Sequence, residues 1–326
     1  MKSETRDMIR RCRHPLELRL LTIAAIISVT VFLLALGASF FHDQLVDMAQ
    51  VSAVEDYHAA HPESASLSDD DVLKKLSGEE RELIDALQWL HWPIVLLAPA
   101  ALVLYMLYFI GSTYGESRAN GVKIGPNQYP EVWAMWVDMA AKMDMNPPPE
   151  LYVRNGNGLL NAFATCVPGW RAYSVVYSDL LERCLANQDW ASLRFILGHE
   201  MGHVRLNHVR WWYNLLAVSA GFAGLNFVLG QPLSRSREYG CDKLGACMAG
   251  EGAHRGLLML AAGKQLYGQV NFQQYLDDHV RQTSRWDLIY NFFNTHPNIN
   301  WRVRALVERR AGHLMHAGGT TKPDPQ

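Results

Sequence analysis

The chain has 326 residues, of which 49% are hydrophobic, and this is enough apolar material for one or two domains with a sizeable buried core. A formal net charge of −2 argues against nucleic acid as a partner, because nucleic-acid-binding domains carry an excess of Lys and Arg. The five cysteines, an odd number without a C-x-x-C pair, indicate neither a disulfide framework nor a thiolate zinc site, and a reducing compartment fits them best.

Two apolar segments in the first third of the chain predict membrane-spanning helices. The first, about residues 20–41, contains no charged residue and is long enough to cross about 30 Å of hydrocarbon. The second, about residues 93–111, is shorter, but Trp and Tyr residues flank or line it as interfacial anchors do. The alternatives are a cleaved signal peptide for the first and a buried core helix for the second. The length of the first segment favours an anchor.

The charges around these segments predict how the chain crosses the membrane. Residues 1–19 carry six Lys or Arg, whereas the polar loop 42–92 between the two spans is acidic. Positively charged flanks remain in the cytoplasm. We therefore expect the amino terminus in the cytoplasm, the acidic loop outside, and everything after the second span in the cytoplasm again.

The pattern divides the chain into a membrane anchor at 1–111, a globular domain at 112–312, and a small, polar, disordered tail at 313–326. We expect a mainly α (α+β) fold, in which a small antiparallel sheet packs on helices. Residues 111–128 are rich in Gly, Ser and Asn and indicate a linker. Hydrophobic periodicity predicts strands and helices. The strands are at 151–153 and 172–177, and the helices are at 129–145, 254–266, 272–280 and 300–310.

Residues 199–203 read His-Glu-Met-Gly-His, which is the H-E-x-x-H pattern typical of zinc peptidases. On a helix, His199 and His203 lie one turn apart on the same face and can reach one metal ion. Glu200 is then placed to act as a base on a water molecule. The preceding residues, 190–197, have helical periodicity, so the alternative of a core helix with two satisfied histidines is the weaker interpretation.

A catalytic zinc usually takes three protein ligands. Val209 stands where a third histidine would lie six residues after the second. His208 is half a turn round a continued helix from His199, so we expect a solvent-facing or structural histidine there. Glu238 is the better candidate, and Asp242 shares its helical face, so one carboxylate can bind metal while the other holds a ligand histidine. Solvated surface charges are the alternative.

The segment 211–230 is apolar enough to resemble a third span. A single crossing would leave Glu238 and His199 on opposite sides of the bilayer, and 20 residues are too few for two crossings. We therefore expect a helical hairpin with its turn near 219–221. Its tip either touches the membrane or packs against the domain's own helices. The tip would carry Phe222, Leu225 and Phe227.

Several motifs occur together in a fixed order. They are Pro147-Pro-Pro-Glu-Leu-Tyr-Val153, Asn161-Ala-Phe-Ala164, His199–His203, Ser234-Arg-x-x-Glu238 with Asp242, and Thr295-His-Pro297 with Arg302. Over about residues 130–326 the chain resembles the HtpX and type I CAAX prenyl protease family of membrane-bound zinc metallopeptidases, the gluzincins. Cys241 departs from the family pattern, because the family often has Ala at the position before the residue that corresponds to Asp242.

The resemblance implies roles for individual residues. It implies one Zn²⁺ per chain, with Glu200 as general base. The metal ligands would be His199, His203 and Glu238. Asp242 would be a carboxylate behind the ligands, His296 would lie near the oxyanion, and Arg302 would order that corner. Substrate backbone would pair along an edge strand formed by Asn161, Ala162, Phe163 and Ala164.

The sequence therefore predicts an integral membrane protein, of bacterial inner-membrane type, with a zinc endopeptidase domain at the cytoplasmic face of the lipid bilayer. Its substrates would be polypeptides, and the resemblance suggests misfolded or membrane proteins. An alternative is a zinc-bound membrane scaffold or chaperone-like binder without turnover, although its expected sign, loss of Glu200 or of a ligand, is not seen. A third hypothesis is a zinc hydrolase that acts on another amide.

Overall fold

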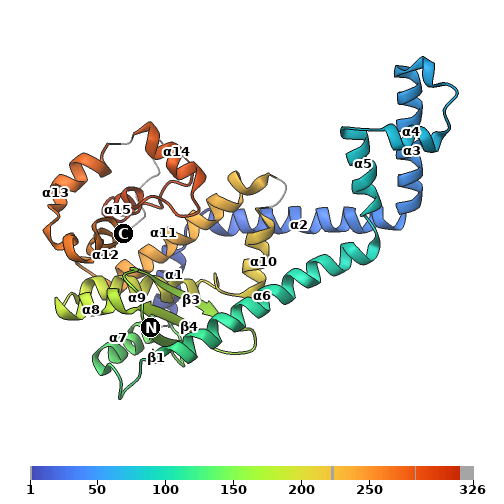
Figure 1. Cartoon of the computed structure of the whole chain (residues 1–326). Helices are drawn as coiled ribbons and strands as arrows, with labels where there is room; N and C mark the ends of the chain where they lie inside the picture. Colours follow the sequence, from blue (N-terminus) through green and yellow to red (C-terminus); the bar gives the residue numbers. More distant parts are fainter. Residues whose placement is uncertain (1, 222–223, 283, 316–326) are drawn as a thin grey trace. The chain divides into compact units, whose positions relative to one another are not determined.

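The computed structural model describes residues 2–221, 224–282 and 284–315 (Figure 1). The fold is mostly helical with one small sheet, as expected. The chain forms two compact units, which are described separately: residues 1–25 with 106–326, and residues 26–105.

Both predicted spans are helices. α2 (Glu17–Phe40) and α6 (Trp92–Asn120) are long and apolar enough to cross a membrane. Only 11% and 6% of their most apolar stretches are buried within the protein. Such exposure of apolar side chains disfavours the alternative of a core helix for the second segment.

α6 continues through residues that the Gly, Ser and Asn content assigned to a linker. Contacts with the sheet hold these last turns in place. The Tyr114 hydroxyl donates to Glu150 Oε2 at 3.0 Å, and Glu116 pairs with Arg154. The linker prediction is wrong for residues 111–120 because these tertiary contacts outweigh weak local helix propensity.

The smaller unit contains the loop between the two spans and has a core of its own. Its elements are α3 (His42–Ala60), η1 (Pro62–Ser64), α4 (Asp69–Lys75) and α5 (Glu79–Gln88). Their apolar faces meet in a cluster of Ala53, Val54, Val72, Leu76 and Ile84. The acidic loop is thus a small helical subdomain.

The sheet of the larger unit has the order β1-β2-β4-β3. Its strands are β1 (Gly121–Lys123), β2 (Glu150–Arg154), β3 (Ala162–Cys166) and β4 (Ala172–Tyr177). The sheet is mixed, so the expectation of an antiparallel sheet is wrong in this respect. β1 pairs antiparallel with β2 and β3 antiparallel with β4, whereas β2 and β4 pair in the parallel direction. β3 lies at an edge, where the motif at 161–164 was expected.

The other elements of the larger unit are helical. They are α1 (Lys2–Cys12), α7 (Pro130–Lys142), α8 (Ser178–Ala186), α9 (Trp190–Arg205), α10 (Trp211–Ser219), η2 (Leu225–Phe227), α11 (Gly230–Ala249), α12 (His254–Leu266), η3 (Tyr267–Gln269), α13 (Phe272–Tyr275), η4 (Leu276–Val280), α14 (Arg285–Phe293) and α15 (Ile299–Val307). The amino-terminal helix α1 contributes Ile9 and Cys12 to the main core.

Small residues allow α9 and α11 to pack closely against each other. A side-chain carbon at Gly198 would lie 3.1 Å from the Cα of Gly245, and one at Gly245 would lie 2.5 Å from the carbonyl oxygen of Phe195. One turn further along α9, a side-chain carbon at Gly202 would lie 3.3 Å from Cys241. Only residues with little or no side chain allow this approach, and it sets the distance between the polar groups on the two helices.

The expected hairpin is present as α10 and α11, which pack on each other. α10 ends at Ser219, at the position predicted for the turn. Phe222 lies outside the described residues. Phe227 is 36% exposed and stacks on Phe292 of α14 with ring centroids 5.0 Å apart.

The start of α9 makes a testable contribution to stability. Asp189 caps the helix by accepting from the backbone N–H of Ser192 at 3.1 Å, and it also accepts from Tyr267 at 2.8 Å and from Arg255 at 3.0 Å. Burial alone would raise the pKa of Asp189, but these donors outweigh it and lower the pKa. We expect Asp189→Asn to reduce the free energy of unfolding by about 1–3 kcal/mol near neutral pH.

The pH dependence of this loss follows from the sign of the shift. Because the pKa of Asp189 is lower in the folded than in the unfolded chain, its stabilisation is complete above the unfolded pKa and is lost as the pH falls through the folded value. Thermal unfolding of wild type and Asp189→Asn should therefore differ at pH 7 and converge in acid. A gap of equal size at both pH values would contradict the assignment.

Candidate metal centre

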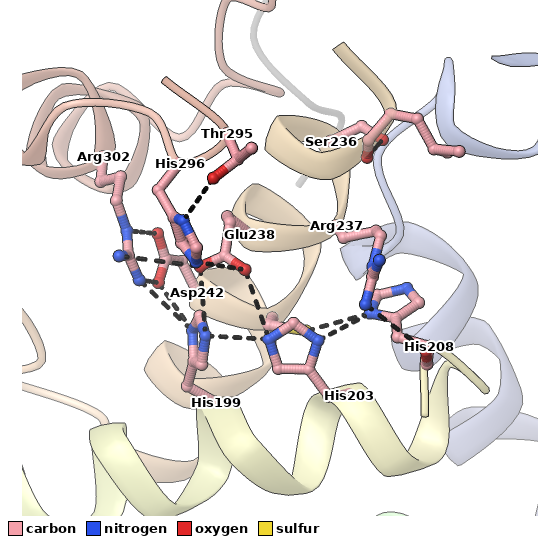
Figure 2. Close-up of polar contacts among 12 residues, drawn as sticks. His199, His203, His208, Ser236, Arg237, Glu238, Asp242, Thr295, His296 and Arg302 are labelled. Carbon is pink, nitrogen blue, oxygen red and sulfur yellow. Dashed lines mark hydrogen bonds and ion pairs between the residues drawn. The ribbon is translucent and has the colours of Figure 1, made fainter. Parts of the chain in front are cut away.

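α9 and α11 bring three candidate ligands to one point. His199 and His203 project from one face of α9 toward Glu238 on α11 (Figure 2). The two Nε2 atoms are 3.2 Å apart. Glu238 Oε2 lies 3.5 Å from His199 Nε2, and Oε1 lies 3.5 Å from His203 Nε2. The two motifs are far apart in the sequence, and the packing of α9 against α11 brings them together.

This geometry fits a tetrahedral zinc ion. Ligand atoms held at 2.0–2.1 Å from such an ion lie about 3.4 Å from one another, which agrees with the separations of 3.2 and 3.5 Å. Both histidines use Nδ1 for other partners, so their Nε2 atoms are left to face the common point. Two imidazoles and a carboxylate, with a fourth position open, are a donor set of catalytic zinc.

A buried carboxylate and arginine support His199 from behind. Asp242 Oδ1 lies 2.9 Å from His199 Nδ1, and Arg302 donates to both oxygens of Asp242, at 2.6 and 2.8 Å. Arg302 Nη1 also lies 3.7 Å from Glu238 Oε2. Burial opposes ionisation of both acids, but Arg302 and His199 lower the pKa of Asp242, and His199 and His203 lower that of Glu238. Both acids are therefore carboxylates.

Glu200 follows His199, the first candidate ligand on α9, and is 8% exposed. Burial raises the pKa of Glu200 to about 7. It lines a cavity of about 530 Å³, together with the candidate ligands, and β3 forms another part of the wall. The residues at 161–164 thus line the same cavity as the candidate ligands.

His296 lies at the rim of this cavity, in the segment between α14 and α15. Its side chain is 65% exposed, with Nε2 at 3.6 Å from Glu238 Oε1. Its Nδ1 is 3.1 Å from the hydroxyl of Thr295. His296 is therefore the exposed member of the group of side chains around Glu238 and lines the same cavity.

Of the two alternatives expected for His208, the structure excludes the solvent-facing one and shows a buried histidine with polar partners. α9 ends at Arg205, and Asn207 has a φ of 68°, so the helical spacing does not extend to residue 208. His208 is fully buried, with Nδ1 3.0 Å from Nδ1 of His203. In the sequence, Asn207 was the sign that the helix ends before His208, because Asn often takes the left-handed conformation that follows the last turn of a helix.

Glu17 carries no signal for this site in the sequence, since it lies 182 positions before the first ligand at the start of a candidate span. Its Oε1 lies 3.1 Å from His208 Nε2 and accepts from the hydroxyl of Tyr213 at 3.1 Å. Glu17 also pairs with Arg13. Figure 2 shows His208 on the side of His203 away from Glu238.

A second group of possible ligand atoms comprises His203, His208 and Cys241. Burial raises the pKa of the Cys241 thiol well above its usual value. Cys241 is fully buried and is not among the residues that line the cavity, whereas all three members of the first group line it. The first group, with its carboxylate, is therefore the better candidate within the described residues.

Comparison with known proteins agrees with the motif pattern. Residues 126–213 and 211–310 match the model of peptidase family M48. The chain is 23% identical over 218 residues to a protease HtpX homolog of Helicobacter acinonychis, which covers 55% of this chain and 67% of that protein. It is 31% identical over 106 residues to a protease HtpX homolog of Pediococcus pentosaceus, covering 32% of this chain and 34% of the relative.

A plant relative matches over a shorter stretch. The chain is 28% identical over 107 residues to the chloroplast plastoglobule-localized metallopeptidase 48 of Arabidopsis thaliana, and the match covers 32% of this chain and 29% of the relative. The chain thus spans less than a third of the length of that protein. No solved structure gives a significant match.

Proposed function

We propose that this chain, which belongs to peptidase family M48, is a zinc-dependent endopeptidase that hydrolyses peptide bonds within polypeptide substrates. Family membership makes it a metallopeptidase. The observation that carries the identity of the metal is the set of separations among His199, His203 and Glu238, which match the edges of a zinc tetrahedron.

The proposed mechanism assigns one role to each residue at the cavity. When bound, zinc polarises the scissile carbonyl and lowers the pKa of water. Glu200 takes a proton from the attacking water and transfers it to the leaving amine nitrogen, for which a pKa of about 7 is suitable. His296, at the rim, donates to the oxygen that becomes negative as the carbonyl is attacked.

We propose that the substrate binds as an additional strand. β3 is an edge strand and lines the cavity. The backbone of residues 161–164 would then pair with an extended stretch of substrate, which explains why a polypeptide is the expected substrate. An edge strand recognises backbone rather than particular side chains, in keeping with misfolded or membrane proteins as substrates.

We propose that α2 and α6 anchor the enzyme in a bilayer, with the amino terminus and the peptidase domain (112–312) in the cytoplasm. The support is the apolar character of both helices and the six Lys or Arg of residues 1–19. The proposed division into an anchor (1–111) and a peptidase domain (112–312) is made by position in the sequence. In the structure, residues 1–25 belong to the same compact unit as the candidate metal centre.

Cleavage of β-casein by the purified full-length protein tests this function. We expect fragments to appear in the presence of Zn²⁺, to be abolished by 1,10-phenanthroline, and to return when Zn²⁺ is restored. Binding of casein without fragments would favour a scaffold or chaperone-like binder. Absence of both binding and fragments would contradict the proposal that polypeptides are the substrates.

A further inference from the structure

We propose that Glu17, acting through His208, positions the ligand His203, so that the start of the first candidate span forms part of the metal centre. This inference rests on the proposed zinc site. Glu17 and its partner Arg13 lie outside the residues 126–310 that match the family. Neither is therefore assigned a role by that match.

The contacts fix the direction of each hydrogen bond once His203 binds metal through Nε2. Its Nδ1 then carries the proton and donates to Nδ1 of His208 at 3.0 Å. His208 must in turn carry its proton on Nε2, which donates to Glu17 Oε1 at 3.1 Å. Every nitrogen in the chain from metal to carboxylate thus has a defined partner.

The arrangement repeats the support of the other histidine. His199 donates to Asp242, which pairs with Arg302. His203 reaches a carboxylate through one more imidazole, and that carboxylate pairs with Arg13. A carboxylate behind a ligand histidine fixes its tautomer and ring orientation and strengthens its bond to the metal.

The contact between Glu17 and His208 is completely buried, which argues against its being accidental. The side chains of Glu17 and His208 are both 0% exposed. Placing a carboxylate in the interior is costly unless charge and hydrogen bonds compensate. Arg13 supplies the charge and also donates to the carbonyl of Leu206 at 2.9 Å, just after α9 ends. The amino-terminal segment is thereby tied to the end of the helix that carries both ligand histidines.

Packing gives this connection a fixed geometry. Leu21, one turn after Glu17 on α2, packs with Tyr213 of α10 and Leu233 of α11. Tyr213 also donates its hydroxyl to Glu17. The position of the carboxylate is thus set by the same helices that surround the metal centre, and a displacement of the start of α2 would be passed to His203 through His208.

The affinity of the full-length protein for Zn²⁺ tests the proposal. Chelator-stripped protein in detergent is titrated with Zn²⁺ against a chromogenic chelator. We expect Glu17→Gln, which keeps the shape and removes the charge, to weaken Zn²⁺ binding about 10- to 100-fold. Glu150→Gln is the matched control, because Glu150 is another carboxylate that accepts from two tyrosines and a lysine of the same unit but lies away from the ligands.

Two further measurements separate positioning from general destabilisation. The absorption spectrum of the Co²⁺-loaded protein should change in Glu17→Gln and stay as in wild type in Glu150→Gln, because it reports ligand geometry. Glu17→Gln and His208→Gln should also be non-additive, since both break one path. Wild-type affinity and an unchanged Co²⁺ spectrum in Glu17→Gln would overturn the proposal, as would full additivity.

The outcome also distinguishes this inference from the proposed function. His203→Ala removes the ligand itself. If His203→Ala binds Zn²⁺ as tightly as wild type, the zinc site is wrong. If His203→Ala loses Zn²⁺ but Glu17→Gln does not, the site stands and only the role of Glu17 fails.

Discussion

Glu200→Gln is expected to abolish peptide hydrolysis while the protein still holds its zinc. The amide is nearly isosteric with the carboxylate but has no basic oxygen, and the proposed ligands are untouched. Loss of a general base lowers turnover by about 10²- to 10⁴-fold. The measurement is the rate of β-casein cleavage together with the zinc content of the same sample by elemental analysis.

The control for this variant is Glu251→Gln, at an exposed carboxylate in the turn after α11. It should cleave casein at the wild-type rate. Turnover retained by Glu200→Gln would refute the role of Glu200 as base. Loss of both turnover and zinc would instead show that the substitution disturbs the metal centre and that its effect is not specific to the proton transfer.

His203→Ala is expected to lose both zinc and activity. It removes one of three proposed ligands and leaves Glu238 with a single imidazole partner on α9. The loss of zinc affinity should exceed the 10- to 100-fold typical of removing a partner behind a ligand. Zinc content and casein cleavage of the purified variant measure the two effects.

His279→Ala is the matched histidine control, because His279 is exposed in η4 and contacts Tyr275 with ring centroids 5.4 Å apart. It should retain full zinc content and turnover. A His203→Ala variant that keeps one zinc per chain would show that His203 is not a metal ligand.

Local sequence patterns predicted the features that depend on neighbours along the chain. The two histidines of α9 share a face because four residues span about one turn of helix. α2 was predicted as a spanning helix because an uncharged apolar stretch of this length is long enough to cross the hydrocarbon core of a bilayer. β2 and β4 were predicted because β-branched and aromatic residues are gathered in short runs.

Predictions failed where distant residues decide the local structure. α6 extends to Asn120 because the sheet holds its last turns, which Gly and Ser alone would not maintain. β4 pairs antiparallel with β3 along one edge and parallel with β2 along the other, and the strand patterns alone did not specify these directions. His208 is buried rather than solvent-facing, and its Nε2 lies 3.1 Å from a carboxylate oxygen of Glu17, a residue 191 positions away in the sequence.

Residues 199–203 alone specify the chemistry that one helix can present: a pair of imidazoles one turn apart with a carboxylate beside them. The acidic motif at Glu238 and Asp242 was also visible in the sequence, but the helix packing that brings it to the histidines was not, and Glu17 carried no signal at all. Glu238 comes within 3.5 Å of both histidines because glycines let α9 and α11 approach closely. Glu17 reaches His208 because α2 begins against α10 and α11. Such contacts join residues far apart in the chain, and hydrophobic periodicity, which reports which face of a helix is buried, does not specify the partner that covers it.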